Sequence, residues 1–112
     1  MSKLSFDFNN TAPTAPKKIE GKDIAGKLRL TLVPTSTNRS IAKVREYGSV
    51  KYGSDDNWKK VPAQYCKDAL YRHWLAFLDD PYSVDKESGL LHIEHLLTNA
   101  SFLNELVHQE KG

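Results

Sequence analysis

The most constraining feature of the sequence is the wide apolar surface of residues 89–108. A helix turns about 100° per residue, so one set of apolar side chains falls on a single arc: Ile93, Leu96, Leu97, Ala100, Leu103 and Val107. A second set widens this arc: Leu91, Phe102 and Leu106. We expect the remaining polar stripe to face solvent: Glu94, Thr98, Ser101 and Glu105. A helix with so broad an apolar arc has to pack against more than one neighbour.

Two further helices are predicted before this one. The first carries Ile41, Val44 and Tyr47 at three-residue spacing and is interrupted or ended by Gly48 and Gly53. The second runs from near Pro62 to about Leu78. One face of this second helix collects five side chains: Cys66, Leu70, His73, Trp74 and Phe77.

Three helices predict an all-α fold, namely a small helical bundle of about three main helices with an extended N-terminal arm. Because so short a chain has few helices to cover the third, we expect oligomerisation to complete the bundle. Residues 1–26, with two prolines and no sustained period, are predicted to be a flexible or docking arm, and residues 27–112 a single helical domain. Residues 27–33 (KLRLTLV) alternate like a strand but lack a clear partner, so we expect extended chain packed across the helices.

Composition excludes several classes of protein. The 16 basic and 14 acidic residues give a net charge of +2, too balanced to indicate a nucleic-acid binder. A single cysteine excludes an intramolecular disulfide and a multi-cysteine zinc site. No run approaches the roughly 18 apolar residues that cross a bilayer, and MSKLSFDFNN lacks the apolar core of a signal peptide. We therefore expect a cytoplasmic protein without membrane or nucleic-acid partners.

The segment EYGSVKYGSDDNWKK combines two glycines with Tyr47, Tyr52 and Trp58. One interpretation is a ligand loop, in which aromatic rings stack on a base and lysines meet phosphates. The alternative is a glycine-capped helix end whose aromatic side chains anchor the loop to the core.

The segment VDKESGLLHIEHLLTN is the sharpest motif. His92 and His95 are three residues apart on the predicted third helix, which we place from about Gly89 to His108, and Asn99 follows one turn later. Asp85 and Glu87 lie just before this helix, so the group can hold a divalent metal or grip a phosphate. The alternative is a helix start capped by Ser88, with the histidines in a subunit interface.

The second helix has its own histidine, His73, beside Arg72 on the apolar face, where a structural histidine is more common than a catalytic base. The phosphate-loop, dinucleotide-binding, zinc-protease and serine-hydrolase motifs are absent. Cys66 points into the predicted core, which argues against a cysteine nucleophile.

Four segments taken together resemble a known family: GKLRLTLVP, YGSVKYGSDDNWKK, ALYRHWLAFL and DKESGLLHIEHLLTNASFL. Their order and spacing are similar to the phage-associated N-terminal domain of dATP/dGTP diphosphohydrolase, related to the all-α MazG-like pyrophosphohydrolases. The resemblance implies an oligomeric, nucleotide-handling protein encoded by a bacteriophage and working in the cytoplasm of the infected host. Its matching positions would contact a purine nucleotide or a nucleotide-derived signal: Lys27, Arg29, Lys51, Tyr52, Asn57, Trp58, Arg72, His73, Ser88, His92, His95 and Asn99.

The predicted helices depart from the MazG pattern, because they contain neither the ExxE nor the ExxD motif that holds magnesium in such enzymes. If the chain is catalytic, Mg²⁺ or Mn²⁺ is the expected cofactor, and otherwise none is expected. The candidate metal ligands are Asp85, Glu87, His92 and His95, and the candidate catalytic residues are Glu87 and His92.

Three functional hypotheses follow. The first is hydrolysis of purine deoxynucleoside triphosphates to monophosphate and pyrophosphate. The second is a non-catalytic sponge that sequesters a host immune signal, a cyclic nucleotide or an ADP-ribose derivative, and so blocks antiviral defence. The third is a protein-interaction module that uses the broad apolar helix.

Overall fold

The computed structural model describes residues 18–19, 22–23 and 26–111. The chain divides into two units, one that ends at Leu32 and one that starts at Val33. The arm predicted over residues 1–26 lies mostly outside the described residues.

The first unit contains one minimal hairpin and one turn of helix. Strands β1 (Lys18–Ile19) and β2 (Lys22–Asp23) pair antiparallel, with Lys18 opposite Asp23. The alternating segment 27–33 is neither strand nor fully extended chain, because Leu30–Leu32 forms a 3-10 helix. No described strand pairs with this segment, so its backbone groups form a local turn instead.

Helix α1 (Thr35–Tyr52) opens the second unit and runs through Gly48. The predicted interruption at Gly48 is therefore wrong, while the predicted end at Gly53 is confirmed. Gly53 has φ 68°, the left-handed conformation that favours glycine at a helix C-terminus. A glycine inside a helix costs about 1 kcal/mol, and the tertiary contacts of α1 offset this cost.

Helix α2 (Ala63–Asp79) follows a short 3-10 helix, Asn57–Lys60, and begins directly after Pro62 as predicted. Of the face predicted from its sequence, Cys66 is buried and His73 and Phe77 are half-buried, whereas the Trp74 side chain is exposed. The chain then forms a structured loop of residues 80–91.

Helix α3 (His92–Lys111) starts three residues later than predicted. The preceding loop is held by its own hydrogen bonds, from the Asp85 amide to the Leu90 carbonyl (2.8 Å) and from the Gly89 amide to the Asp85 carbonyl (2.7 Å). Ser88 is therefore not the N-cap of α3, and its hydroxyl lies 2.6 Å from His95 Nε2 instead. The three helices confirm the predicted all-α fold class.

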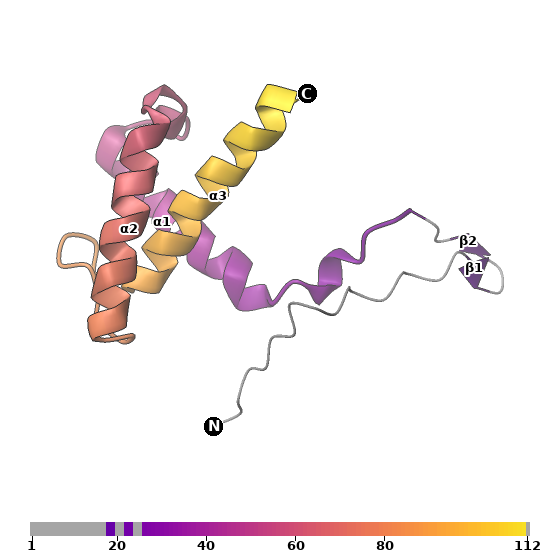
Figure 1. The fold of residues 1–112 in the computed structure, drawn as a ribbon, viewed down its shortest axis with the longest axis horizontal. Coiled ribbons are helices and arrows are strands. Elements are labelled where there is room, and N and C mark those ends of the chain that lie inside the picture. The colour runs from indigo at the N-terminus through magenta and orange to yellow at the C-terminus, as the bar shows by residue number, and fades with distance from the viewer. Residues whose placement is uncertain (1–17, 20–21, 24–25, 112) are drawn as a thin grey trace. The chain divides into compact units, whose positions relative to one another are not determined.

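Helix α3 packs against both α1 and α2, which lie on different faces of it (Figure 1). The most buried polar side chains of the described chain are Glu94, His95 and Thr98, with exposed fractions of 5%, 8% and 1%. The expectation that Glu94 and Thr98 face solvent is therefore wrong. Helix α1 covers this side of α3, and its Ser40 and Lys43 hydrogen-bond the Glu94 carboxylate.

The outer face of α2 leaves large apolar side chains exposed, among them Tyr71, Leu75 and Leu78. The structure is of one chain, so the expected homo-oligomer stays a prediction. Among the described residues, no helix is both long and apolar enough to cross a membrane.

Candidate functional site

A cavity of about 640 Å³ lies between the three helices and the loop of residues 80–91. Its size falls in the usual range of small-ligand sites, about 300–1,000 Å³. Several predicted ligand and metal residues line it: Lys51, Tyr52, Asn57, Trp58, Arg72, His73, Asp85, Glu87, His95 and Asn99. The fold thus brings together residues that are up to 48 positions apart in the sequence (Lys51 to Asn99).

One wall of the cavity is aromatic and cationic. Trp58 stacks on Phe102 of α3, with ring centroids 4.5 Å apart and an angle of 8° between the planes. The Arg45 guanidinium lies 5.3 Å from the centre of the Phe102 ring and donates a hydrogen bond to the Asp55 carbonyl. Tyr52 and Tyr65 also line the cavity and are largely exposed, so a ligand can reach their rings.

The sequence did not identify Arg45, Tyr65 or Phe102 as site residues. Arg45 could have been found, because it lies three residues before Gly48 and seven before Tyr52, on the same side of α1. Phe102 could not, because it was counted in the apolar arc of α3 and only the folded chain brings it to Trp58.

A second wall is formed where α1 meets the loop. Lys51 forms an ion pair with Glu87, and this contact lowers the pKa of Glu87 and raises that of Lys51. Tyr47 also acts to lower the pKa of Glu87. The carboxylate predicted to be catalytic or metal-ligating is therefore engaged by a cation from α1.

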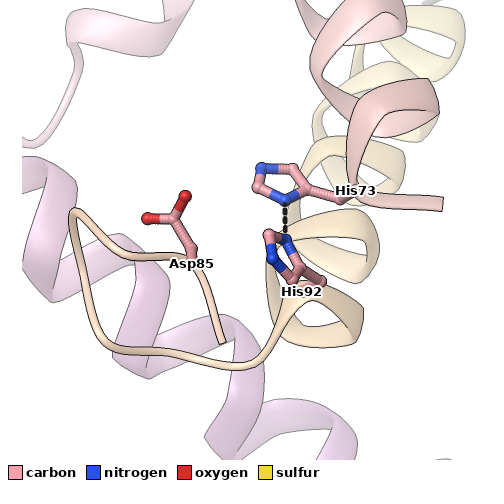
Figure 2. A group of neighbouring side chains, drawn as sticks. All are labelled: His73, Asp85 and His92. Carbon is pink, nitrogen blue, oxygen red and sulfur yellow. Dashed lines mark hydrogen bonds between the residues drawn. The ribbon is translucent and has the colours of Figure 1, made fainter. Parts of the chain in front are cut away.

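The third wall holds a cluster of histidines. His73 Nδ1 lies 2.8 Å from His92 Nδ1, and the His73 ring stacks on His95 with centroids 4.6 Å apart. The histidine of α2 thus joins the two histidines that the sequence placed together on α3. Figure 2 shows His73, Asp85 and His92 meeting from α2, the loop and the start of α3.

Burial and the neighbouring histidines lower the pKa of His73 to about 4. Burial also lowers the pKa of His95. Burial acts to raise the pKa of Asp85, but hydrogen bonds from Ser88 outweigh it, and the net pKa lies below the ordinary value. At neutral pH the cluster therefore presents the neutral imidazoles of His73 and His95 beside an ionised carboxylate.

Ser88, His95 and Asp85 do not form a hydrolytic triad. The Ser88 hydroxyl (2.6 Å) and the Asp85 carboxylate (3.8 Å) both approach the same nitrogen, His95 Nε2. A triad needs the carboxylate on one ring nitrogen and the serine on the other. Ser88 therefore holds the loop and His95 in place, and a serine nucleophile is excluded by this geometry.

Some predicted ligand residues lie elsewhere. His92 and Ser88 are not among the residues that line the cavity. His92 contacts the lining residue His73, and Ser88 contacts the lining residue His95. Lys27 and Arg29 belong to the unit that ends at Leu32, which is described separately from the helices.

The donor set does not suit magnesium. Mg²⁺ prefers an octahedral shell of oxygens, but among the described residues only two carboxylates line the cavity, and Glu87 pairs with Lys51. One described group of donors has a different composition: ligand atoms of His73, Asp85 and His92 lie within 4.8 Å of one another.

Comparison with known proteins connects the chain to a protein family. No curated protein and no solved structure matches the chain. A family model described as "dATP/dGTP diphosphohydrolase, N-terminal" matches residues 17–112, and this range includes every residue of the cavity. The chain therefore belongs to the dATP/dGTP diphosphohydrolase N-terminal domain family.

Proposed function

We propose that the chain binds a purine deoxynucleoside triphosphate in this cavity and hydrolyses it to the monophosphate and pyrophosphate. The observation that carries the proposal is the cavity itself, with stacking rings and cations on one side and a histidine–aspartate cluster on the other, in a member of this family.

Recognition of the base is assigned to the exposed rings of Tyr52 and Tyr65. Stacking of a base on an aromatic ring contributes about 1–3 kcal/mol. Trp58 already has one ring face covered by Phe102, so it shapes the wall beside the base.

Recognition of the phosphates is assigned to Arg72 and Lys51. Arg72 is exposed at the cavity wall and has no ionic partner within the described part of the chain. Lys51 pairs with Glu87 and can exchange this carboxylate for a phosphate, because both are anionic oxygen acceptors.

Hydrolysis requires a water that attacks the α-phosphorus while the bond to the bridging oxygen of pyrophosphate breaks. The Asp85 carboxylate lines the cavity and can accept the proton of this water, since it is ionised. Glu87 carries its negative charge next to Lys51 and is the second candidate.

The test is incubation of the purified protein with dATP, dGTP, dCTP and dTTP, followed by phosphorus NMR. We expect purine triphosphates to yield monophosphate and pyrophosphate, and Asp85→Asn to abolish turnover. Arg72→Ala should weaken nucleotide binding, whereas Arg39→Ala, an exposed arginine of α1 that does not line the cavity, should not. Equal nucleotide binding by the wild type, Arg72→Ala and Arg39→Ala would refute the cavity as the binding site.

A second candidate function is sequestration without turnover. The described lining residues of the cavity include few carboxylates, and this favours sequestration, because phosphoryl transfer usually depends on metal ions that neutralise the developing negative charge. In this case a host nucleotide signal, cyclic or derived from ADP-ribose, is retained by the protein on ultrafiltration and recovered intact after heating. Turnover of dGTP or dATP would exclude this function.

A further inference from the structure

Two potential metal ligands, His73 and His92, approach each other closely. Their Nδ1 atoms lie 2.8 Å apart and share one proton when no ion is bound. With metal–nitrogen distances of about 2.05 Å, two nitrogens at this separation subtend an angle of about 86° at the ion. This value fits neighbouring positions of an octahedron and is too small for a tetrahedron.

Asp85 supplies the third ligand from the loop. Its carboxylate lies beside the two rings, and the ligand atoms of all three residues fall within 4.8 Å. Neighbouring ligands of one ion lie about 3 Å apart, so a side-chain rotation that brings the carboxylate closer completes the set. The Asp85 side chain is 25% exposed, so it is not fully enclosed by its neighbours.

The surroundings orient these ligands. The Ser88 amide donates a hydrogen bond of 2.9 Å to Asp85 Oδ2, and the His95 ring stacks on the His73 ring. Such outer contacts fix the direction of ligating side chains in metalloproteins. His73 and Asp85 also line the cavity, so the free coordination positions of an ion here open toward it.

We propose that His73, Asp85 and His92 bind one divalent transition-metal ion, through Nδ1 of both histidines and the carboxylate. Two histidines and one carboxylate suit Mn²⁺, Fe²⁺, Co²⁺ or Zn²⁺, whereas Mg²⁺ demands oxygen ligands. Asp85 and His92 are also among the candidate ligands of the sequence analysis, and this proposal adds His73 to them in place of Glu87 and His95.

The ion has a role in the proposed function, because a triphosphate beside the ionised Asp85 needs a compensating cation. The metal site does not depend on that function, however. Metal binding is measured on the nucleotide-free protein, and nucleotide binding is measured with a chelator present. Failure of one is therefore distinguishable from failure of the other.

The first experiment is calorimetric titration of chelator-treated protein with Co²⁺, Zn²⁺ and Mg²⁺, together with the visible spectrum of the cobalt form. We expect one Co²⁺ per chain, with the weak absorption of a site that has more than four ligands, and no comparable binding of Mg²⁺. Equal affinity for Mg²⁺, or no binding of Co²⁺ and Zn²⁺, would overturn the proposal.

Matched variants test the ligand assignment. His73→Asn, His92→Asn and Asp85→Asn should each weaken binding by more than about 100-fold, since loss of an outer contact alone costs about 10–100-fold. His108→Asn, on the exposed end of α3, and Glu87→Gln should bind as the wild type does. Loss of binding in either control variant would contradict the assignment.

A measurement on the unaltered protein removes any doubt about folding of the variants. Zinc titration followed by nitrogen NMR of the imidazole rings should shift Nδ1 of His73 and His92 as metal-bound nitrogens. A metal-bound signal on His95 in place of His73 would overturn the ligand set.

Discussion

The Glu94 carboxylate of α3 lies 3.2 Å from the Lys43 ammonium of α1, and it is the buried end of this contact. The Glu94 side chain is 6% exposed, whereas that of Lys43 is 57% exposed. The Ser40 hydroxyl and the Leu91 amide donate further hydrogen bonds to the same carboxylate. Glu94 therefore holds the start of α3 against α1 by several charge-assisted hydrogen bonds.

Substitution Glu94→Gln should destabilise the fold. Hydrogen bonds to a charged group contribute about 1.5–3 kcal/mol, and a buried donor left unpaired adds its desolvation cost. We expect a loss of about 1–3 kcal/mol in the free energy of unfolding, measured by urea denaturation. Glu105→Gln, an exposed glutamate on the same helix, is the control and should change this free energy little.

Stability should also fall in acid through Glu94. Burial acts to raise the pKa of Glu94, but hydrogen bonds from Ser40, Lys43 and Leu91 outweigh it, so the folded-state pKa lies below the ordinary value of about 4.5. When the folded-state pKa of a carboxyl group is lowered, the group stabilises the fold fully at pH values above its unfolded-state pKa. This stabilisation is lost as the pH falls through the folded-state pKa. The urea midpoint should decline below about pH 4.5.

The Glu94→Gln variant separates this contribution from other carboxylates such as Asp85, whose pKa is also lowered. With EDTA present, the variant should lose less stability than the wild type between pH 5 and pH 3. If stability fell equally with pH in the wild type and in Glu94→Gln, Glu94 would not be an ionised, hydrogen-bonded carboxylate in the folded protein.

The apolar spacing of the sequence sufficed to predict three helices and the start of the second at Pro62. It failed at Glu94 and Thr98, because a helical projection shows which residues are polar but not which have a partner on another helix. Ser40 and Lys43 are more than 50 positions before Glu94. Only the packing of α1 on α3 shows that this polar stripe is an interface.

The candidate site also depends on contacts between helices that the spacing of the sequence does not show. His92 and His95 stand out by their spacing on one helix, whereas His73 is a single histidine on an apolar face. Its contacts with both rings arise from the crossing of α2 and α3. Likewise, Ser88 looks like a helix cap in sequence, yet the hydrogen bonds of the loop direct its hydroxyl to His95.

The stack of Trp58 on Phe102 should control both stability and fluorescence. Phe102→Leu removes a ring from a stacked pair and leaves a smaller side chain, at an expected cost of about 1–2 kcal/mol in unfolding free energy. Measured in a Trp74→Phe background, the emission of Trp58 should shift to longer wavelength as water reaches the ring.

Phe77→Leu in that same background is the matched control. Phe77 stacks on residue 74, with centroids 5.7 Å apart in the wild type, and not on Trp58. Its substitution should leave the Trp58 emission unchanged. An equal shift in both variants would mean that the emission reports general loosening of the fold.

The ion pair between Lys51 and Glu87 should contribute little to stability. Both side chains are substantially exposed, at 37% and 60%, and exposed ion pairs are weakened by solvent and salt. A double-mutant cycle of Lys51→Met and Glu87→Gln should give a small coupling that disappears at high salt. A coupling that resists salt would indicate that the loop closes over this pair.

The Cys66 thiol provides a probe of the cavity. Cys66 lines the cavity, is 5% exposed, and has a pKa raised by burial. Because the thiolate is the reactive form, alkylation by iodoacetamide should be at least about tenfold slower in the folded protein than in urea. Mass spectrometry follows the added group, and glutathione in the same solutions corrects for effects of urea on the reagent.

A purine triphosphate bound in the cavity should slow the alkylation of Cys66 further, whereas the Arg72→Ala variant should show no such protection. Reaction at the unfolded rate would mean that the helices open around Cys66 much more often than this packing allows.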